Sequence, residues 1–198
     1  KQDINLPLSL DEISIKKIWH LASLASPEKY REYPILTAKT NSIGTFNIMS
    51  LAIKHSARVL FTSSSEVYGN SKYFPQKESS YDYINPIGER SCYVEGKRFA
   101  ESICFDYLRK RKANICIARI FNTYGPKMHP HDGRVISNFI SKGLNNKSIY
   151  IFGDGLQTRS FCYVSDIVEG LIRLMNSNHI GPMNLGNTHE INIIYLAN

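Results

Sequence analysis

Tyr93 and Lys97 are the two residues whose types and spacing most directly predict acid–base chemistry in this sequence. They lie four residues apart in the segment YVEGK, within a predicted helix, so both side chains project from one face of that helix. A free tyrosine loses its proton near pH 10, and a tyrosine base that works at neutral pH needs its anion stabilised by about 4 kcal/mol. A neighbouring ammonium, helped by a second positive charge, can supply energy of that order in a shielded site. Taken alone the pair indicates little, because Tyr and Lys at this spacing occur on many surface helices.

Polar side chains follow two predicted strands, at the point where each strand ends. The buried strand 58–62 continues into TSSSEVYG (62–69), which carries hydroxyls, a carboxylate and a tyrosine, and the strand 115–121 is followed by Asn122. Ligands of open parallel sheets bind outside the carboxyl ends of the strands. The sequence therefore predicts that these polar groups face a ligand crevice rather than the core.

Strands and helices alternate in the first part of the chain. The expected elements are a strand at 16–22, a helix at 35–55, a strand at 58–62, a helix at 93–112 and a strand at 115–121. Such alternation is typical of right-handed βαβ units with a parallel sheet. The predicted fold class is α/β, a Rossmann-like parallel sheet with helices on both faces.

The regular alternation of strands and helices ends after residue 122, which predicts a smaller and less regular lobe. The expected elements there are a helix at 135–144, a short strand at 148–152, a Gly-Asp-Gly turn at 153–155, a helix capped by Asp166 that runs through Leu174, and a strand at 183–185. We therefore expect a partial NAD-binding domain over 1–122 and a partial substrate-binding lobe over 123–198, with some elements of the lobe packing back on the sheet.

Composition narrows the class of protein. The chain has 198 residues, of which 42% are hydrophobic and 21% charged, as in a globular protein with a substantial core. It contains no run of eighteen apolar residues, and its first residues do not resemble a signal peptide. Four widely spaced cysteines without a C-x-x-C pair favour reduced thiols over a disulfide framework. Together these features predict a cytoplasmic protein that spans no membrane.

The net charge of +7 predicts an anionic partner, such as nucleic acid, an acidic membrane surface or a phosphorylated small molecule. The one basic cluster, 109–112, ends a predicted helix, where cations complement the helix dipole, and no nucleic-acid-binding motif is present. His129 and His131 could form half of a metal site. They lack an acidic or cysteine partner at ligand spacing, so we interpret them as part of a polar loop and expect no metal.

Several motifs together resemble one family of enzymes. They are HLASLAS (20–26), KTNSIGT (39–45), TSSSEVYG (62–69), SCYVEGKR (91–98), FNTYGPKM (121–128), DGRVISNF (132–139) and GDGLQTRSFCYVSD (153–166). The chain resembles, over nearly its whole length, the UDP-glucuronate decarboxylases of the extended short-chain dehydrogenase/reductase superfamily. This resemblance implies a redox-neutral reaction that converts UDP-glucuronate to UDP-xylose through a 4-keto sugar, with NAD as the cofactor.

The resemblance also implies roles for individual residues. Tyr93 would remove the C4 hydroxyl proton, Lys97 would lower the pKa of Tyr93 and hold the nicotinamide ribose, and Ser64 would hydrogen-bond the C4 oxygen. Glu66 would act near C5, although a turn-capping role is the alternative, and Arg159 would anchor the substrate carboxylate or donate a proton. The implied substrate contacts are Lys39, Asn47, Ser65, Asn122, Arg134 and Gln157. The implied cofactor contacts, besides Tyr93 and Lys97, are Leu21, Ser23, Thr40, Thr62 and Thr123.

Ser65 favours decarboxylation over dehydration. Sugar-nucleotide dehydratases with a similar motif carry an aspartate at this position, and a serine cannot supply the same acid. Other readings stay open: a nucleotide-sugar 4,6-dehydratase or 4-epimerase, or a non-catalytic module that keeps a sugar-nucleotide pocket. A nucleic-acid-binding protein is the weakest of the alternatives.

The sequence lacks the strand and Gly-rich turn with which a Rossmann domain opens. We therefore expect the chain to begin inside the cofactor domain, either as a piece of an active enzyme or as a naturally shortened protein with negligible affinity for NAD. The resemblance further implies a homodimer formed through the helices that contain residues 40–55 and 93–112.

Overall fold

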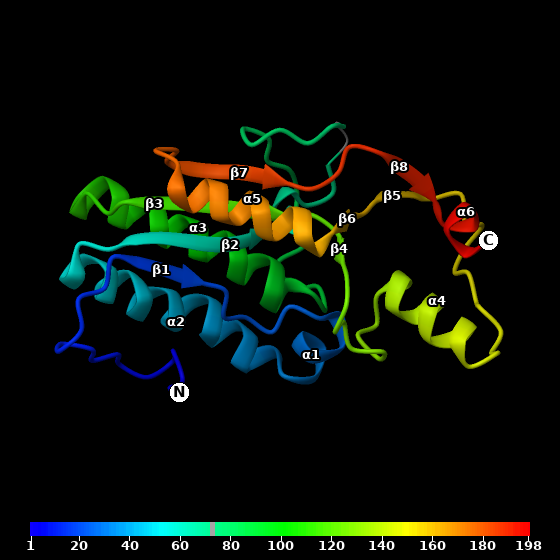
Figure 1. Ribbon diagram of the computed structural model, residues 1–198, viewed down its shortest axis with the longest axis horizontal. Coiled ribbons are helices and arrows are strands. Elements are labelled where there is room, and N and C mark those ends of the chain that lie inside the picture. The colour runs from blue at the N-terminus through cyan, green and yellow to red at the C-terminus, as the bar shows by residue number, and fades with distance from the viewer. Residues whose placement is uncertain (72–73) are drawn as a thin grey trace.

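Four parallel strands form the centre of the molecule. The computed structural model describes residues 1–71 and 74–198. Its main sheet has the order β1-β2-β3-β7, built from β1 (Lys17–His20), β2 (Arg58–Ser64), β3 (Ile115–Ile120) and β7 (Gly181–Leu185) (Figure 1). The register pairs Leu60 of β2 with Cys116 of β3, and Cys116 with Gly181 of β7. The predicted α/β class is confirmed, as are the strands expected near 16–22, 58–62 and 115–121. The strand expected at 183–185 in the second lobe is β7, and it belongs to this sheet.

Helices cover both faces of this sheet. α2 (Pro34–His55) and α3 (Ser91–Arg111) lie on one face, and α5 (Val164–Asn176) lies on the other (Figure 1). Central strands buried on both sides need runs of apolar residues, which residues 59–61 of β2 and 115–118 of β3 supply. The long helices predicted at 35–55 and 93–112 are confirmed within one or two residues.

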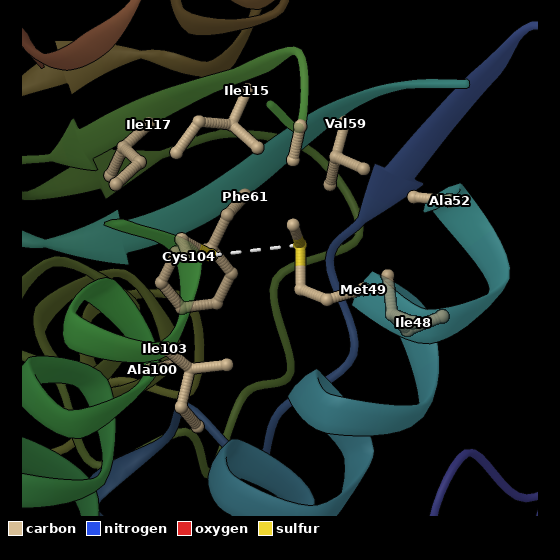
Figure 2. Close-up of a cluster of buried hydrophobic side chains, with 11 residues drawn as sticks. Ile48, Met49, Ala52, Val59, Phe61, Ala100, Ile103, Cys104, Ile115 and Ile117 are labelled. Carbon is tan, nitrogen blue, oxygen red and sulfur yellow. Dashed lines mark hydrogen bonds between the residues drawn. The ribbon is translucent and has the colours of Figure 1, made fainter. Parts of the chain in front are cut away.

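The larger hydrophobic cluster lies between β2, β3 and the pair α2 and α3. Figure 2 shows Met49 of α2 and Cys104 of α3 meeting below the strands, with their sulfur atoms 4.0 Å apart. Val59 and Phe61 of β2 and Ile115 and Ile117 of β3 point into this cluster, whereas the intervening Leu60, Cys116 and Ala118 pack against α5. Alternate residues of each strand therefore face opposite helix layers.

The smaller lobe contains short elements at one end of the sheet (Figure 1). They are β4 (Thr123–Tyr124), α4 (Val135–Leu144), β5 (Thr158–Ser160), β6 (Cys162–Tyr163), β8 (Glu190–Asn192) and α6 (Ile193–Ala197). β4 pairs with β6 in parallel, and β5 pairs with β8 in antiparallel. α5 and β7 also follow residue 123 in the chain, yet both belong to the main sheet layer. Two further short helices, α1 (Pro27–Glu32) and η1 (Ser65–Tyr68), follow β1 and β2.

Two predictions about the second half of the chain are wrong. Residues 148–152 form no strand, and Tyr150 and Phe152 are exposed, because no neighbouring strand is available to pair with this segment. Asp166 does not cap α5, which begins one turn earlier after Tyr163; Asp166 lies in its first turn, where a carboxylate still complements the helix dipole. The helix at 135–144 and the turn at 153–155 are confirmed. In the described part of the chain, no helix is both long enough and apolar enough to cross a membrane.

Candidate active site

Lys97 is buried at the end of β2. Its side chain is 2% exposed, and Nζ donates a hydrogen bond to the carbonyl of Thr62 over 2.8 Å. The same ammonium lies 4.8 Å from the ring centroid of Phe61 and 5.9 Å from that of Tyr93. Burial lowers the pKa of Lys97 to about 7. A lysine of this kind changes its charge near neutral pH and responds strongly to a neighbouring anion.

Tyr93 lies one helical turn before Lys97 and is also buried. Its ring stacks on Tyr30 of α1, with centroids 5.1 Å apart and an interplanar angle of 13°. Burial raises the pKa of the Tyr93 phenol, and the negative charge of Glu66 acts in the same direction, whereas a hydrogen bond with Ser64 and the positive charge of Arg134 lower it. The structure therefore brings Tyr93, Lys97, Ser64, Glu66 and Arg134 close to one another, and the roles that the resemblance implies for them stay predictions.

Ser64 ends β2, and the short helix η1 that follows carries Glu66. Ser64 caps the short helix η1, because its Oγ accepts a hydrogen bond from the backbone N–H of Glu66 over 3.2 Å. The carboxylate of Glu66 forms an ion pair with Arg90, and both side chains line a cavity of about 380 Å³ beside α3. Gly69 ends this turn with φ +69°, and a Cβ there would lie 2.5 Å from the carbonyl of Tyr83. The close approach of two backbone segments therefore fixes the turn that carries Glu66.

The predicted cofactor residues gather mainly at the carboxyl ends of β1 and β2. Leu21 is exposed there, Ser23 Oγ donates to Asn41 Oδ1 over 3.0 Å, and Thr62 Oγ1 donates to the carbonyl of His20 over 3.1 Å. Thr40, on α2, accepts a hydrogen bond from Asn5. Thr123 begins β4, shortly after the end of β3, and its hydroxyl donates to the carbonyl of Phe121 over 3.0 Å.

The predicted substrate residues are more widely spread. Arg134 precedes α4, where it donates to the carbonyl of Ala25 over 2.7 Å and pairs with Asp132 at 3.3 Å. Ser65 is half-buried in η1, and Asn122 donates to the carbonyl of Ser160 over 3.1 Å. Ser65 and Asn122 therefore lie just beyond the ends of β2 and β3, and Arg134 is near enough for its charge to act on Tyr93.

Four other predicted residues make no contact with Tyr93, Ser64 or Glu66 among the hydrogen bonds and ion pairs of the described residues. Lys39 is exposed on α2, and Asn47 donates to the backbone carbonyls of Ile4 and Leu6. Gln157 donates to the carbonyl of Phe152, and Arg159 to that of Thr158. Among the hydrogen bonds and ion pairs of the described residues, none joins Gln157 or Arg159 to Tyr93, Ser64 or Glu66. Their roles stay predictions.

A metal site is not apparent at this end of the sheet. Within residues 1–71 and 74–198, no group of three or more His, Cys, Asp or Glu side chains is placed to hold a metal ion. Nδ1 of His129 accepts a hydrogen bond from the backbone N–H of His131 over 3.1 Å, so these two residues are part of a loop turn.

Three residues that contact the site were not predicted from the sequence. Tyr30 stacks on Tyr93, Arg90 pairs with Glu66, and the fully buried Asn41 has an amide nitrogen without a hydrogen-bond partner among the described residues. Asn41 could have been suspected, because a buried polar residue on the inner side of a helix needs a partner. Tyr30 and Arg90 lie outside any periodic pattern, and only the folded chain brings them to the site.

Comparison with known proteins decides the family. Residues 5–186 match the family model described as "NAD dependent epimerase/dehydratase family". The chain belongs to this family. Membership in the NAD dependent epimerase/dehydratase family confirms the extended short-chain reductase type that the motifs indicated.

Similar proteins within the NAD dependent epimerase/dehydratase family include UDP-glucuronic acid decarboxylases. The chain is 52% identical over 197 residues to UDP-glucuronic acid decarboxylase 3 of Arabidopsis thaliana, covering 100% of this chain and 57% of the relative. It is 51% identical over 185 residues to UDP-glucuronic acid decarboxylase 1 of Xenopus tropicalis, covering 93% of this chain and 44% of the relative. The chain thus spans about half the length of the curated relatives that it matches, and the resemblance to the decarboxylases is confirmed.

A solved structure of the same family has the same fold. It is a UDP-N-acetylglucosamine 4-epimerase from Methanobrevibacter ruminantium M1, in complex with UDP-N-acetylmuramic acid. The TM-score is 0.89 at 28% sequence identity, covering 99% of this chain and 63% of that chain. Identity to the decarboxylases is therefore almost twice the identity to this epimerase.

Proposed function

We propose that this protein catalyses the NAD-dependent decarboxylation of UDP-glucuronate to UDP-xylose. The observation that carries the proposal is the buried group of Tyr93, Lys97 and Ser64 beside the carboxylate of Glu66, in a chain that is about half identical over its length to UDP-glucuronic acid decarboxylases. Many epimerases and dehydratases would share the first three residues. Ser65 in place of an acid, and the identity to decarboxylases, favour loss of carbon dioxide.

The residues present fit a nicotinamide dinucleotide. The carboxyl ends of β1 and β2 offer the exposed Leu21, the half-buried Ser23 and the Lys97 ammonium on one edge of the sheet, where such ligands lie in open α/β folds. The buried amide nitrogen of Asn41 has a free donor at the same edge. When bound, NAD would accept a hydride from C4 of the sugar and later return it.

The chain's own residues would handle the protons and orient the sugar. Tyr93, as its anion, would take the proton of the C4 hydroxyl, and Ser64 would hold the C4 oxygen through a hydrogen bond. The Lys97 ammonium would stabilise the Tyr93 anion, since the burial that raises the phenol pKa also strengthens attraction between the two charges. With a ketone at C4, the carboxylate on C5 leaves as carbon dioxide, and the ketone takes up the electron pair.

Glu66 and Arg134 complete this arrangement. Glu66 lies near the Tyr93 phenol. Its ion pair with Arg90 holds the Glu66 carboxylate at the wall of the cavity. The positive charge of Arg134 also acts on Tyr93 and would attract the anionic substrate. The site would thus combine a base, a hydroxyl donor and opposite charges around one sugar ring.

Mass analysis of the nucleotide sugar tests the proposal. The protein is incubated with UDP-glucuronate, with and without added NAD, and we expect a UDP-pentose to form. A product of unchanged mass with altered C4 configuration would indicate an epimerase, and loss of water would indicate a dehydratase. Tyr93→Phe should abolish the product. Tyr107→Phe also removes a hydroxyl from α3, one that is hydrogen-bonded to Ser50 of α2, and it should not abolish the product.

We also propose that two copies of the chain associate through α2 and α3. The outer surfaces of these helices expose Ile43, Phe46 and Phe99, and the rings of Phe46 and Phe99 lie 6.2 Å apart. An apolar surface of this kind supports a contact between copies. Light scattering should give the mass of a dimer, and Phe99→Glu should give a monomer. Val168→Glu, on the exposed side of α5, is the matched control that should leave the dimer intact.

A further inference from the structure

Helix α3 carries a third titratable residue in line with Tyr93 and Lys97. Glu101 follows Lys97 by four residues, so the three side chains form one stripe, and all three are buried. Oppositely charged side chains at this spacing normally pair with each other on a helix. The Lys97 ammonium instead bonds the carbonyl of Thr62, and no ion pair joins it to Glu101 in the described structure.

Arg119 of β3 forms an ion pair with the Glu101 carboxylate. Its Nε and Nη2 donate to the two carboxylate oxygens over 3.0 and 2.7 Å, and both side chains are 11% exposed. Its Nη1 donates to the carbonyl of Glu78 over 2.8 Å, and the guanidinium lies 4.8 Å from the ring centroid of Tyr68. A planar fork held by these further contacts can satisfy both oxygens of one carboxylate, which a lysine cannot.

The position of Arg119 breaks the pattern of its strand. Ile115 and Ile117 point from β3 into the cluster with α2 and α3, and the next residue on that face is Arg119. An arginine at an inward position of a central strand is expensive to bury unless a carboxylate meets it. Its presence there indicates a need for a cation opposite Glu101.

We propose that Arg119 is a positioning residue for Lys97: by engaging both oxygens of Glu101, it prevents that carboxylate from capturing the Lys97 ammonium. Lys97 then stays at the Thr62 carbonyl, beside Tyr93. Arg119 thus determines the position of the Lys97 ammonium, and the effect of that position on turnover rests on the proposed decarboxylase function.

The groups around Lys97 leave Glu101 as its competing partner. Cys104 of α3 is a neutral thiol, because burial raises its pKa to about 12. His20 of β1 is a neutral imidazole, because burial lowers its pKa to about 3. Tyr93 is a phenol in this state, and β2 contributes only a ring and a carbonyl. Among the described groups that act on Lys97, Glu101 is thus the one carboxylate.

The pH titration of Lys97 tests this assignment without requiring turnover. Protein labelled with ¹³C-lysine is titrated by NMR, and the Lys97→Met variant assigns the Lys97 signal. Arg119→Met should raise the Lys97 titration midpoint by at least about one pH unit, because the released carboxylate pairs with the ammonium. The double variant Glu101→Met/Arg119→Met should bring the midpoint back close to the wild-type value. Arg109→Met, which removes an exposed arginine from the end of α3, is the control without a shift.

Two results would overturn the assignment. One is a folded Arg119→Met protein, as judged by circular dichroism, whose Lys97 midpoint equals that of the wild type. The other is a double variant whose midpoint stays as high as that of the single variant. Should Arg119→Met not fold, Arg119→Lys applies the same test, since a point charge leaves one Glu101 oxygen free and should raise the midpoint in the same direction.

Turnover gives an independent readout. If the protein forms UDP-xylose, Arg119→Met should lower kcat, and the double variant should recover a large part of it. A purely structural role for the ion pair predicts no such recovery. If the wild type forms no UDP-xylose, the proposed function fails, while the NMR titration still decides the role of Arg119.

Discussion

Replacing Lys97 by methionine should make this protein more stable while removing its activity. The pKa of Lys97 falls from 10.5 to about 7 on folding because burial disfavours the ammonium. At pH 7 the unfolded chain therefore binds a proton more strongly than the folded chain, which costs the folded state ~4 kcal/mol. Methionine removes this cost but leaves the Thr62 carbonyl without its donor, a loss of about 1 kcal/mol. We expect a net gain of about 3 kcal/mol in the free energy of unfolding.

The gain in stability depends on pH. A folded pKa below the unfolded one means that wild-type stability rises as pH increases from about 7 toward 10.5. At pH 9 the cost of the buried ammonium falls to ~2 kcal/mol, so the advantage of the methionine variant should shrink to about 1 kcal/mol. Urea unfolding at pH 7 and pH 9 measures both values.

A suitable control is Lys110→Met, which changes an exposed lysine near the end of the same helix. Its stability difference from the wild type should be small and the same at both pH values. The reasoning is refuted if the Lys97→Met difference does not change with pH, or if that variant is less stable than the wild type at both values. Increased stability with loss of UDP-xylose formation would show that Lys97 is retained for chemistry.

Three further substitutions test the packing around the site. Gly69→Ala should destabilise the protein by roughly 1–3 kcal/mol, because φ is +69° and the new Cβ meets the Tyr83 carbonyl; thermal unfolding measures this. Arg58→Met should cost about 3 kcal/mol in urea unfolding, since Arg58 donates to the carbonyls of Met175, Leu174 and His179. Met49→Ala should cost roughly 2–5 kcal/mol by the same measurement, because Met49 is fully buried in the cluster of Figure 2.

The long elements could be predicted from the sequence, and the short ones could not. α2 and α3 were predictable from their length and β2 from its apolar run 59–61, although the hydrophobic period of the helices is weak. In α2, for example, Thr40 and Asn41 are buried whereas Phe46 is exposed. β4, β5, β6 and β8 contain two or three residues each, too few for any period to show. The segment 148–152 has the composition of a strand but no partner strand, which is a property of the tertiary structure.

The candidate site was predictable where strand ends define it. Thr62 and Ser64 lie at the carboxyl end of the buried strand β2, and Tyr93 and Lys97 share a helix face, so their convergence follows from topology. The stacking of Tyr30 on Tyr93 joins residues from separate helices, and no local pattern signals it. Arg119 does leave a signal in the sequence, since a charged residue interrupts an apolar strand face.

Arg58 has a consequence for how the chain is made. Its guanidinium binds carbonyls that lie 116 to 121 residues later in the sequence. At the usual speed of synthesis, those carbonyls follow Arg58 out of the ribosome after on the order of 10 seconds. During that interval α5 has not arrived, so Leu60 and Cys116 of the second apolar sheet face remain uncovered. We therefore expect nascent chains to depend on a chaperone that shields this face until α5 is complete.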